Sequence, residues 1–176
     1  MLVSLDYEIA FARLEDISYL SSIERAAAKL LKGQVPDSIL NEAMRPAEFR
    51  NALENNRLWV ARKNHVPVGF AHAEMLGPTE AHLQELDVRP DHTRRGVGNR
   101  LVAAVCTWAS QQHLSLSLTT FRDVPFNMPF CIRLGFEVVP VTELGSALHT
   151  IIQEETRRGL DPERRVAMRY RVSELL

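Results

Sequence analysis

The sequence predicts a mixed α/β domain, and three observations support this class. The chain has 176 residues, which is the usual length of one domain (about 100–200 residues), so we expect a single domain over 1–176. Hydrophobic residues make up 45% and charged residues 24% of the chain, as in ordinary globular proteins. Finally, segments of strand-like and helix-like periodicity alternate along the chain, which is the pattern of an α/β fold.

The amino-terminal half predicts a strand, two helical segments, a hairpin and a further strand. The first strand ends at Leu14, the first helix is stopped by Gly33, and Pro46 interrupts the second helical segment. Two strand-like runs flank a turn at 63–65, which predicts the hairpin, and Pro67 suggests that its second strand begins irregularly. The segments are, in order, 7–14, 14–33, 35–56, 57–76 and 81–90.

The carboxyl-terminal half predicts three helices and three strands. Leu101, Val105 and Trp108 recur at helical spacing, and leucine alternates with serine or threonine in the following strand. Gly135 ends a short helix, after which strands enclose a helix with a glycine near its start. The first of these helices lies within 92–109, and the segments that follow are, in order, 114–121, 124–135, 136–141, 142–160 and 164–172.

Charge and composition exclude several classes of protein. The net charge of −1 lacks the basic excess of a protein that coats nucleic acid. Cys106 and Cys131 are too few for a disulfide scaffold or a zinc site, so we expect no metal and a reducing, cytoplasmic compartment. The first 16 residues lack the pattern of a signal peptide, and no apolar run approaches about 18 residues, so we expect no membrane association.

A positively charged glycine turn precedes the helix that starts near Val97. Gly96 and Gly98 let the backbone approach an anion, and the free N–H groups of a helix start attract negative charge. Arg94, Arg95 and Arg100 add cations that pair with phosphate oxygens. The turn therefore predicts a phosphate cradle, with a glycine-rich surface connection as the alternative. Dinucleotide and nucleoside triphosphate motifs are disfavoured, because Leu101 replaces the third glycine and no Walker lysine follows.

Two motifs in this order resemble the GNAT superfamily of Gcn5-related N-acetyltransferases. The segment 85–105 resembles its acetyl-CoA-binding motif, in which a strand ending in Val-x-Pro is followed by a glycine turn and a helix. The segment 127–139 resembles its second motif. Thr93 stands where the family usually has Gln or Arg, and Cys131 stands where a tyrosine is usual. The matching residues are Val88, Pro90, Gly96, Gly98, Asn127, Phe130, Gly135 and Phe136.

The resemblance implies a GNAT fold over nearly the whole chain. In that fold a mixed, mostly antiparallel central sheet is flanked by helices, and the fourth and fifth strands splay apart to admit the pantetheine of acetyl-CoA. The implied reaction is direct attack of a primary amine on the thioester in a ternary complex. The backbone of Leu86, Asp87 and Val88 would pair with the pantetheine, and Asn127 would contact its arm. The residues implied at the pyrophosphate are Arg94, Arg95, Gly96, Val97, Gly98 and Asn99.

Three residues are candidates for proton transfer. Glu85 and His82 lie on the strand leading into the implied site, and each is a candidate base, with a solvated glutamate and a strand-end histidine as alternatives. The apolar phase of that strand slips near Glu85, which predicts either a β-bulge or burial of both faces. For Cys131 three interpretations stay open: acid toward the thiolate, site of self-acetylation, or small buried hydrophobe.

The acceptor is left open between small-molecule and peptide amines. The main alternative function is a non-catalytic acyl-CoA-binding or sensing module, which the departures at Thr93 and Cys131 favour. A nucleic-acid-binding protein using Arg94–Arg100 and a different nucleotide-binding enzyme are weaker alternatives. Many members of the family form dimers and the closing strand offers an edge, so a homodimer is also open.

Overall fold

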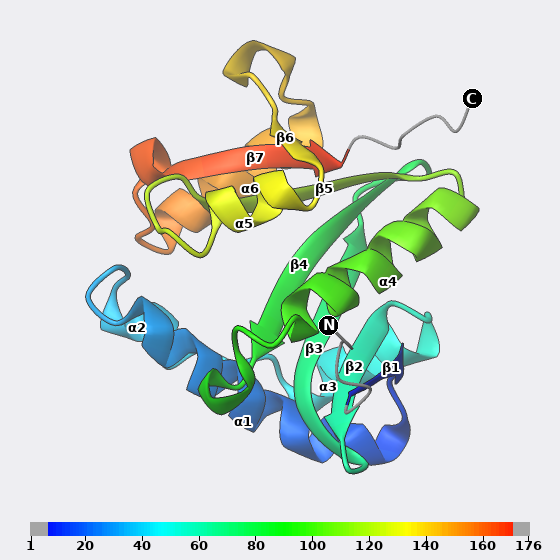
Figure 1. Ribbon diagram of the computed structural model, residues 1–176. Helices are drawn as coiled ribbons and strands as arrows, with labels where there is room; N and C mark the ends of the chain where they lie inside the picture. The colour runs from blue at the N-terminus through cyan, green and yellow to red at the C-terminus, as the bar shows by residue number, and fades with distance from the viewer. Residues whose placement is uncertain (1–6, 171–176) are drawn as a thin grey trace. The chain divides into compact units, whose positions relative to one another are not determined.

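The computed structural model describes residues 7–170, which form a seven-stranded sheet with flanking helices (Figure 1). The strand order is β1-β2-β3-β4-β5-β7-β6. The strands are β1 (Glu8–Phe11), β2 (Leu58–Lys63), β3 (Val66–Met75), β4 (Glu80–Val88), β5 (Ser115–Phe121), β6 (Phe136–Val138) and β7 (Arg165–Tyr170). The α-helices are α1 (Ile17–Ala28), α2 (Asp37–Leu40), α3 (Pro46–Glu54), α4 (Val97–Gln111), α5 (Met128–Arg133) and α6 (Ser146–Arg157).

The expected mixed, mostly antiparallel sheet is confirmed. The pairs β1–β2, β2–β3, β5–β7 and β6–β7 are antiparallel, and β4 pairs with β5 in parallel. The parallel register joins Glu80–His82 to Ser115–Ser117, at the beginning of both strands. β4 and β5 are thus hydrogen-bonded only where both strands begin, as expected if the fourth and fifth strands splay apart. The last predicted strand continued to Val172, of which the part beyond Tyr170 lies outside the described residues.

Two details of the elements differ from, or refine, the sequence prediction. The second helical segment is interrupted before Pro46, as predicted: it divides into α2 and α3, and Pro46 begins α3, because a helix start needs no N–H from its first residue. Glu48 accepts a hydrogen bond from the Arg45 backbone there, which completes the helix cap. The irregular start of β3 is confirmed, since its register with β2 shifts between Ala61 and Arg62. Ala81, His82 and Leu83 are buried in succession, which agrees with burial of both faces of β4; the bulge stays a prediction.

The chain divides into two compact units, of which the first comprises residues 1–74 and 84–105. In the first unit, α1 and α3 pack on one face of β2 and β3, and the beginning of α4 packs on the other (Figure 1). Phe49 of α3 meets Phe70 of β3 edge to face, with ring centroids 5.4 Å apart. The core of this face consists of Ile17, Leu20, Ile23, Phe49, Ala52, Leu58, Val60 and Phe70.

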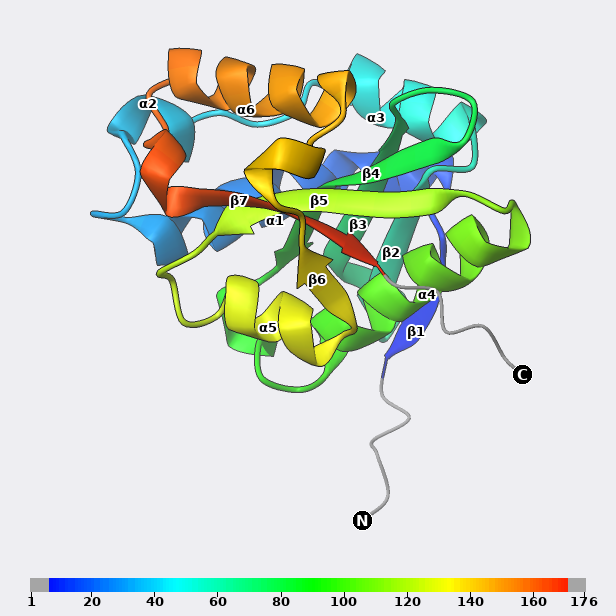
Figure 2. The same cartoon turned by 90° about the horizontal axis from the view of Figure 1, so that it is seen from above.

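The second unit comprises residues 75–83 and 106–176. Its helix α6 runs alongside β7 (Figure 2), and Leu148 packs there against Val139 and Ala167. Arg165 of β7 forms an ion pair of 2.7 Å with Glu155 of α6 beneath this contact. Whether the whole chain behaves as one domain stays a prediction. Among residues 7–170, no helix is both long and apolar enough to cross a bilayer.

Gly69 allows β3 to approach β4 more closely than any side chain would permit. A Cβ at this position would lie 2.9 Å from the carbonyl oxygen of Asp87 and 3.2 Å from Cγ2 of Val88. The replacement Gly69→Ala is therefore expected to destabilise the protein by about 1–3 kcal/mol, the usual cost of overpacking. Urea unfolding measures this, with Gly77→Ala as the control because nothing lies within 4 Å of its Cβ. Equal unfolding midpoints for the two variants would contradict the close approach.

Candidate active site

The glycine turn before α4 has the backbone conformation that its sequence predicts. Arg94 and Gly96 both have positive φ angles, 60° and 79°, and Val97 begins the helix. The side chain of Val97 is buried and anchors the helix start, whereas the residues before it are exposed. The first N–H groups of a helix have no partner within it, so those of α4 are available to an anion at this turn. The turn therefore has the backbone geometry that the predicted phosphate cradle requires, and phosphate binding itself stays a prediction.

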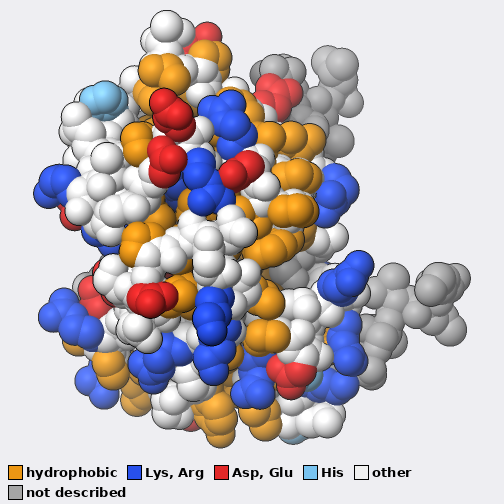
Figure 3. All heavy atoms as spheres, turned by 90° about the vertical axis from the view of Figure 1, so that its left-hand side faces the viewer, with side chains coloured by type: hydrophobic (Ala, Val, Ile, Leu, Met, Phe, Trp, Pro, Cys, Tyr) orange, Lys and Arg blue, Asp and Glu red, His pale blue; other side chains and the backbone are white. Residues whose placement is uncertain are grey.

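Three arginines surround this turn without acidic partners. Arg94, Arg95 and Arg100 are exposed, and none of them forms an ion pair with another residue between 7 and 170. Lys and Arg side chains are prominent in the lower part of the space-filling view (Figure 3). Positive charge at a helix start adds to the helix dipole, and both attract a phosphate group.

Contacts within the first unit hold the turn in place. The backbone N–H of Arg89 donates to the Val68 carbonyl at 2.9 Å, which fixes the end of β4 against β3. The Thr93 hydroxyl donates to the Pro90 carbonyl at 2.8 Å, and the hydroxyl of Tyr7 lies 2.9 Å from Nδ1 of His92. Thr93 thus closes a short 3-10 turn instead of supplying the polar arm that the family usually has there.

The strand that precedes this turn, β4, carries a buried carboxyl group. Burial raises the pKa of Asp87 well above its ordinary value, and the nearby carboxylates of Glu85 and Glu24 raise it further. Its Oδ2 atom has no hydrogen-bond partner among the described residues. Burial thus disfavours the charged form of the Asp87 side chain, and the contact predicted for this residue uses its backbone.

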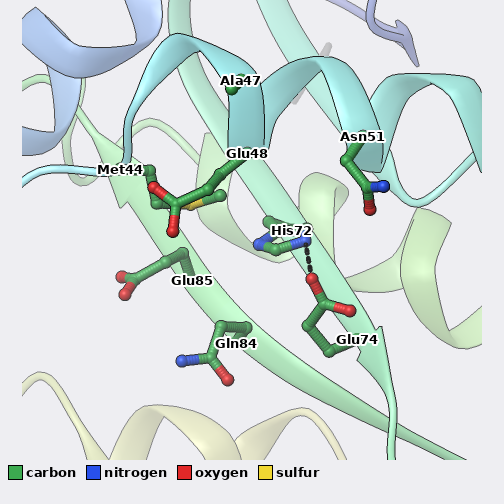
Figure 4. A pocket seen from close by; sticks show the side chains of 8 residues that line it. All are labelled: Met44, Ala47, Glu48, Asn51, His72, Glu74, Gln84 and Glu85. Atoms are coloured by element: carbon green, nitrogen blue, oxygen red, sulfur yellow. Dashed lines mark ion pairs between the residues drawn. The ribbon is translucent and has the colours of Figure 1, made fainter.

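A pocket of about 450 Å³ opens between α3 and the strands β3 and β4 (Figure 4). Glu85 lies in its wall, one residue before the segment 86–88 to which the resemblance assigns the pantetheine. The pocket is lined by Met44, Ala47, Glu48, Asn51, His72, Glu74, Gln84 and Glu85. The backbone N–H of Met44 donates to Glu24 at 2.8 Å, which ties the rim of the pocket to α1.

His72 and Glu74 form a pair in this pocket that the sequence prediction missed. Nε2 of His72 lies 2.9 Å from Oε1 of Glu74, and Oε2 of Glu74 accepts a hydrogen bond of 2.8 Å from Arg57 (Figure 4). Burial lowers the pKa of His72, so the imidazole is neutral at pH 7. A histidine and a glutamate two positions apart on a strand share a face, and this spacing was the available signal.

The remaining predicted residues lie in the second unit. His82 is 2% exposed, its Nδ1 lies 3.0 Å from the Ser117 hydroxyl, and burial lowers its pKa to about 4. Burial raises the pKa of Cys131 to about 11, which agrees with a small buried hydrophobe. Asn127 precedes α5, where its carbonyl accepts a hydrogen bond of 3.0 Å from the Cys131 backbone. No group of His, Cys, Asp and Glu between residues 7 and 170 is arranged to hold a metal ion.

Comparison with known proteins now defines the class. Residues 25–136 match the sequence model of the Acetyltransferase (GNAT) family, and the chain belongs to this family. The matched region contains the glycine turn, β4 and the pocket described above.

Named relatives and solved structures agree with this assignment. The chain is 37% identical over 95 residues to a mycothiol acetyltransferase of Parafrankia sp. (strain EAN1pec), and 30% identical over 93 residues to the uncharacterized N-acetyltransferase YafP of Escherichia coli (strain K12). Each match covers 53% of this chain, but 27% of the first relative and 54% of the second.

Among solved structures, the PaiA N-acetyltransferase of Thermoplasma acidophilum, in complex with coenzyme A, has the same fold. Its TM-score is 0.73 at 16% identity, with 96% of this chain and 100% of that chain covered. The N-acetylglutamate synthase of Neisseria gonorrhoeae, complexed with coenzyme A and N-acetyl-glutamate, gives a TM-score of 0.71 at 16% identity, covering 96% of this chain and 35% of that one.

Proposed function

We propose that the protein transfers an acetyl group from acetyl-CoA to a primary amine by direct attack in a ternary complex. One observation carries this proposal: β4 places Glu85 in the pocket wall and continues directly into Leu86–Val88 and the cationic glycine turn. A site for an amine and a site for a phosphate-bearing thioester are thus adjacent on one strand. The coenzyme A complexes of two proteins with this fold, and the acetyltransferase names of two relatives, support the same activity.

The residues of the turn fit the cosubstrate. The backbone N–H groups of 97–99, with Arg94 and Arg95, hold the pyrophosphate, and Gly96 leaves open space where a side chain would block it. The strand segment Leu86–Val88 offers backbone groups to the pantetheine, and the Val88 N–H polarises the thioester carbonyl. When bound, acetyl-CoA supplies the activated acetyl group.

Glu85 takes the proton that the acceptor must lose. An alkyl ammonium has no lone pair, so one proton leaves before the nitrogen attacks the thioester, and general bases contribute about 10²–10⁴-fold to such steps. The carboxylate of Glu85 faces the pocket beside the cosubstrate strand, which is where this proton is released. The second proton of the reaction goes to the departing thiolate of coenzyme A.

Two glycines with the same backbone conformation provide the test of cosubstrate binding. Gly96 and Gly33 have φ angles of 79° and 80°, and a Cβ at either would meet nothing within 4 Å. Alanine at either position should cost about 1–2 kcal/mol of stability. Only Gly96→Ala is expected to weaken acetyl-CoA binding, by about tenfold or more, as measured by isothermal titration calorimetry. Equal affinities in the two variants would contradict the cradle.

A non-catalytic acyl-CoA-binding module is the second candidate, because Thr93 and Cys131 replace two polar residues usual in the family. Release of free coenzyme A thiol in the presence of a panel of primary amines separates the two functions. Acetyl-CoA binding without thiol release on any amine would establish the non-catalytic module. Absence of acetyl-CoA binding by folded protein would contradict both.

A further inference from the structure

The pocket beside β4 is strongly acidic. Three of its eight lining residues, Glu48, Glu74 and Glu85, carry carboxyl groups, and no lysine or arginine lines it. They come from three different elements, α3, β3 and β4, and all three side chains are drawn around the same cavity in Figure 4. An occupant of this cavity therefore meets negative charge on several sides.

Hydrogen bonds from two arginines hold two of these carboxyl groups in place. The backbone N–H of Arg45 donates to Glu48 at 2.6 Å, and this bond, with the adjacent guanidinium, lowers the pKa of Glu48. Glu74 accepts a hydrogen bond of 2.8 Å from Arg57. Arg45 and Arg57, which pair with these carboxyl groups, do not line the cavity, so the charged groups at its wall are acidic and favour a cationic ligand over an acidic one.

His72 supplies independent evidence that a hydrogen-bond donor belongs in this pocket. The side chain of His72 lines the pocket and is only 3% exposed. Its Nδ1 atom has no hydrogen-bond partner among the described residues. Nε2 lies 2.9 Å from Glu74, close enough for an ion pair though not aligned as a hydrogen bond. This carboxylate favours the proton on Nε2, which leaves Nδ1 as an acceptor.

The charged groups that face His72 preserve this arrangement. Glu74 on its own strand and Glu48 on α3 favour a proton on the imidazole, whereas Arg57, which precedes β2, opposes it. Burial is the largest influence and keeps the ring neutral. A buried acceptor without a partner is costly, and an ammonium group, which carries only donors, would satisfy it.

We propose that this pocket is the acceptor site and that the acceptor is an aliphatic diamine or polyamine. The inference rests on the proposed acetyltransferase function and names its substrate class. The nitrogen that receives the acetyl group must first lose its proton, and with it its positive charge. Once Glu85 holds that proton, only an acceptor with a second ammonium group still matches Glu48, Glu74 and the Nδ1 acceptor of His72.

Three acceptors of one chain length test this proposal. 1,5-Diaminopentane, pentylamine and 5-aminopentanoate carry the same reacting amine, with a positive, neutral or negative group at the other end. We expect kcat/KM, measured by thiol release at saturating acetyl-CoA, to fall by at least about tenfold at each step in this order. Pentylamine as good as the diamine, or aminopentanoate better than pentylamine, would overturn the proposal.

A matched pair of variants tests whether the pocket causes the preference for the diamine over pentylamine. Glu48→Gln removes one charge, yet glutamine can still cap α3. It is expected to reduce the ratio of kcat/KM for diaminopentane over pentylamine by about fivefold or more. Glu54→Gln makes the same change on the same helix, outside the pocket, and should leave the ratio unchanged. Equal ratios in the two variants would count against the proposal.

Failure of this inference differs from failure of the proposed function. If the protein acetylates all three amines equally, the function stands and the diamine assignment is wrong. If the protein binds acetyl-CoA but acetylates no amine, the proposed function is wrong. Calorimetry with the same three compounds then shows whether the pocket binds a diamine. Tighter binding of diaminopentane than of pentylamine, lost in Glu48→Gln but kept in Glu54→Gln, supports a diamine site; equal binding overturns it.

Discussion

The replacement Glu85→Gln is expected to lower kcat for amine acetylation by about 10²–10⁴-fold at neutral pH, the usual contribution of a general base. Glutamine has nearly the same shape and keeps hydrogen bonds in the pocket, but it cannot accept the proton of an ammonium group. Affinity for acetyl-CoA should stay within about twofold, because the predicted contacts with the cosubstrate come from Leu86–Val88 and the turn. Steady-state kinetics with a diamine acceptor and calorimetry with acetyl-CoA measure the two quantities.

A pH profile distinguishes a lost base from a damaged pocket. An alkyl amine has a pKa near ~10.4, so each unit of pH below this value raises the free amine about tenfold. The rate of Glu85→Gln should therefore rise about tenfold per pH unit between pH 7 and 9, with a shallower rise in the wild type. Glu80→Gln makes the same change on the same strand outside the pocket, and should follow the wild type. A pH-independent deficit in Glu85→Gln would contradict its role as base.

The replacement Arg62→Met is expected to lower the free energy of unfolding by about 3–5 kcal/mol, because it leaves a buried carboxylate without its counter-charge. Arg62 and Asp16 are 3% and 2% exposed, and Nη2 of Arg62 lies 2.5 Å from Oδ2 of Asp16. The same carboxylate accepts a hydrogen bond from the Arg13 backbone at 2.6 Å, so the pair fastens the start of α1 to β2. Urea unfolding followed by circular dichroism measures the loss.

Two further variants show that burial is the cause. Arg157 forms an ion pair with Glu154 on the surface of α6, and Arg157→Met should cost less than about 1 kcal/mol, as exposed pairs usually do. The double replacement of Asp16 by leucine and Arg62 by methionine should recover most of the stability, because no buried charge is left over. A loss in the double variant equal to that of Arg62→Met alone would contradict this explanation.

The order of the elements could be predicted from the sequence because each signal is local. Alternating leucines marked β5, and apolar residues at helical spacing marked α4. The interruption at Pro46 could also be predicted, but the sequence did not show that this proline starts the second of two helices. The hydrogen bond from the Arg45 backbone to Glu48, which caps α3, shows this.

The acidic pocket could not be predicted in the same way. Glu48, His72 and Glu85 are separated along the chain, and only the packing of α3 against the sheet brings them to one cavity. His72 sits in an apolar run, where a histidine looks like a core residue. His82 looked suited to acid–base chemistry; it is buried beside Ser117, and its part in proton transfer stays a prediction. Glu85 was a candidate because it precedes a recognisable motif, and its role as base stays a prediction as well.

The close approach at Gly69 has a consequence for how β4 can change. Successive residues of a strand point to opposite faces, so a slip of one residue would turn Glu85 out of the pocket and bring Leu86 in. The hydrogen bond of 2.9 Å from the Arg89 backbone to the Val68 carbonyl holds that register, and only a glycine at 69 fits beside the carbonyl of Asp87. Between Glu85 and Arg89, the protein should therefore tolerate a change of side chain better than a change in the number of residues. An insertion or deletion of one residue there would misplace the proposed base, Glu85, and the proposed cosubstrate segment 86–88 together.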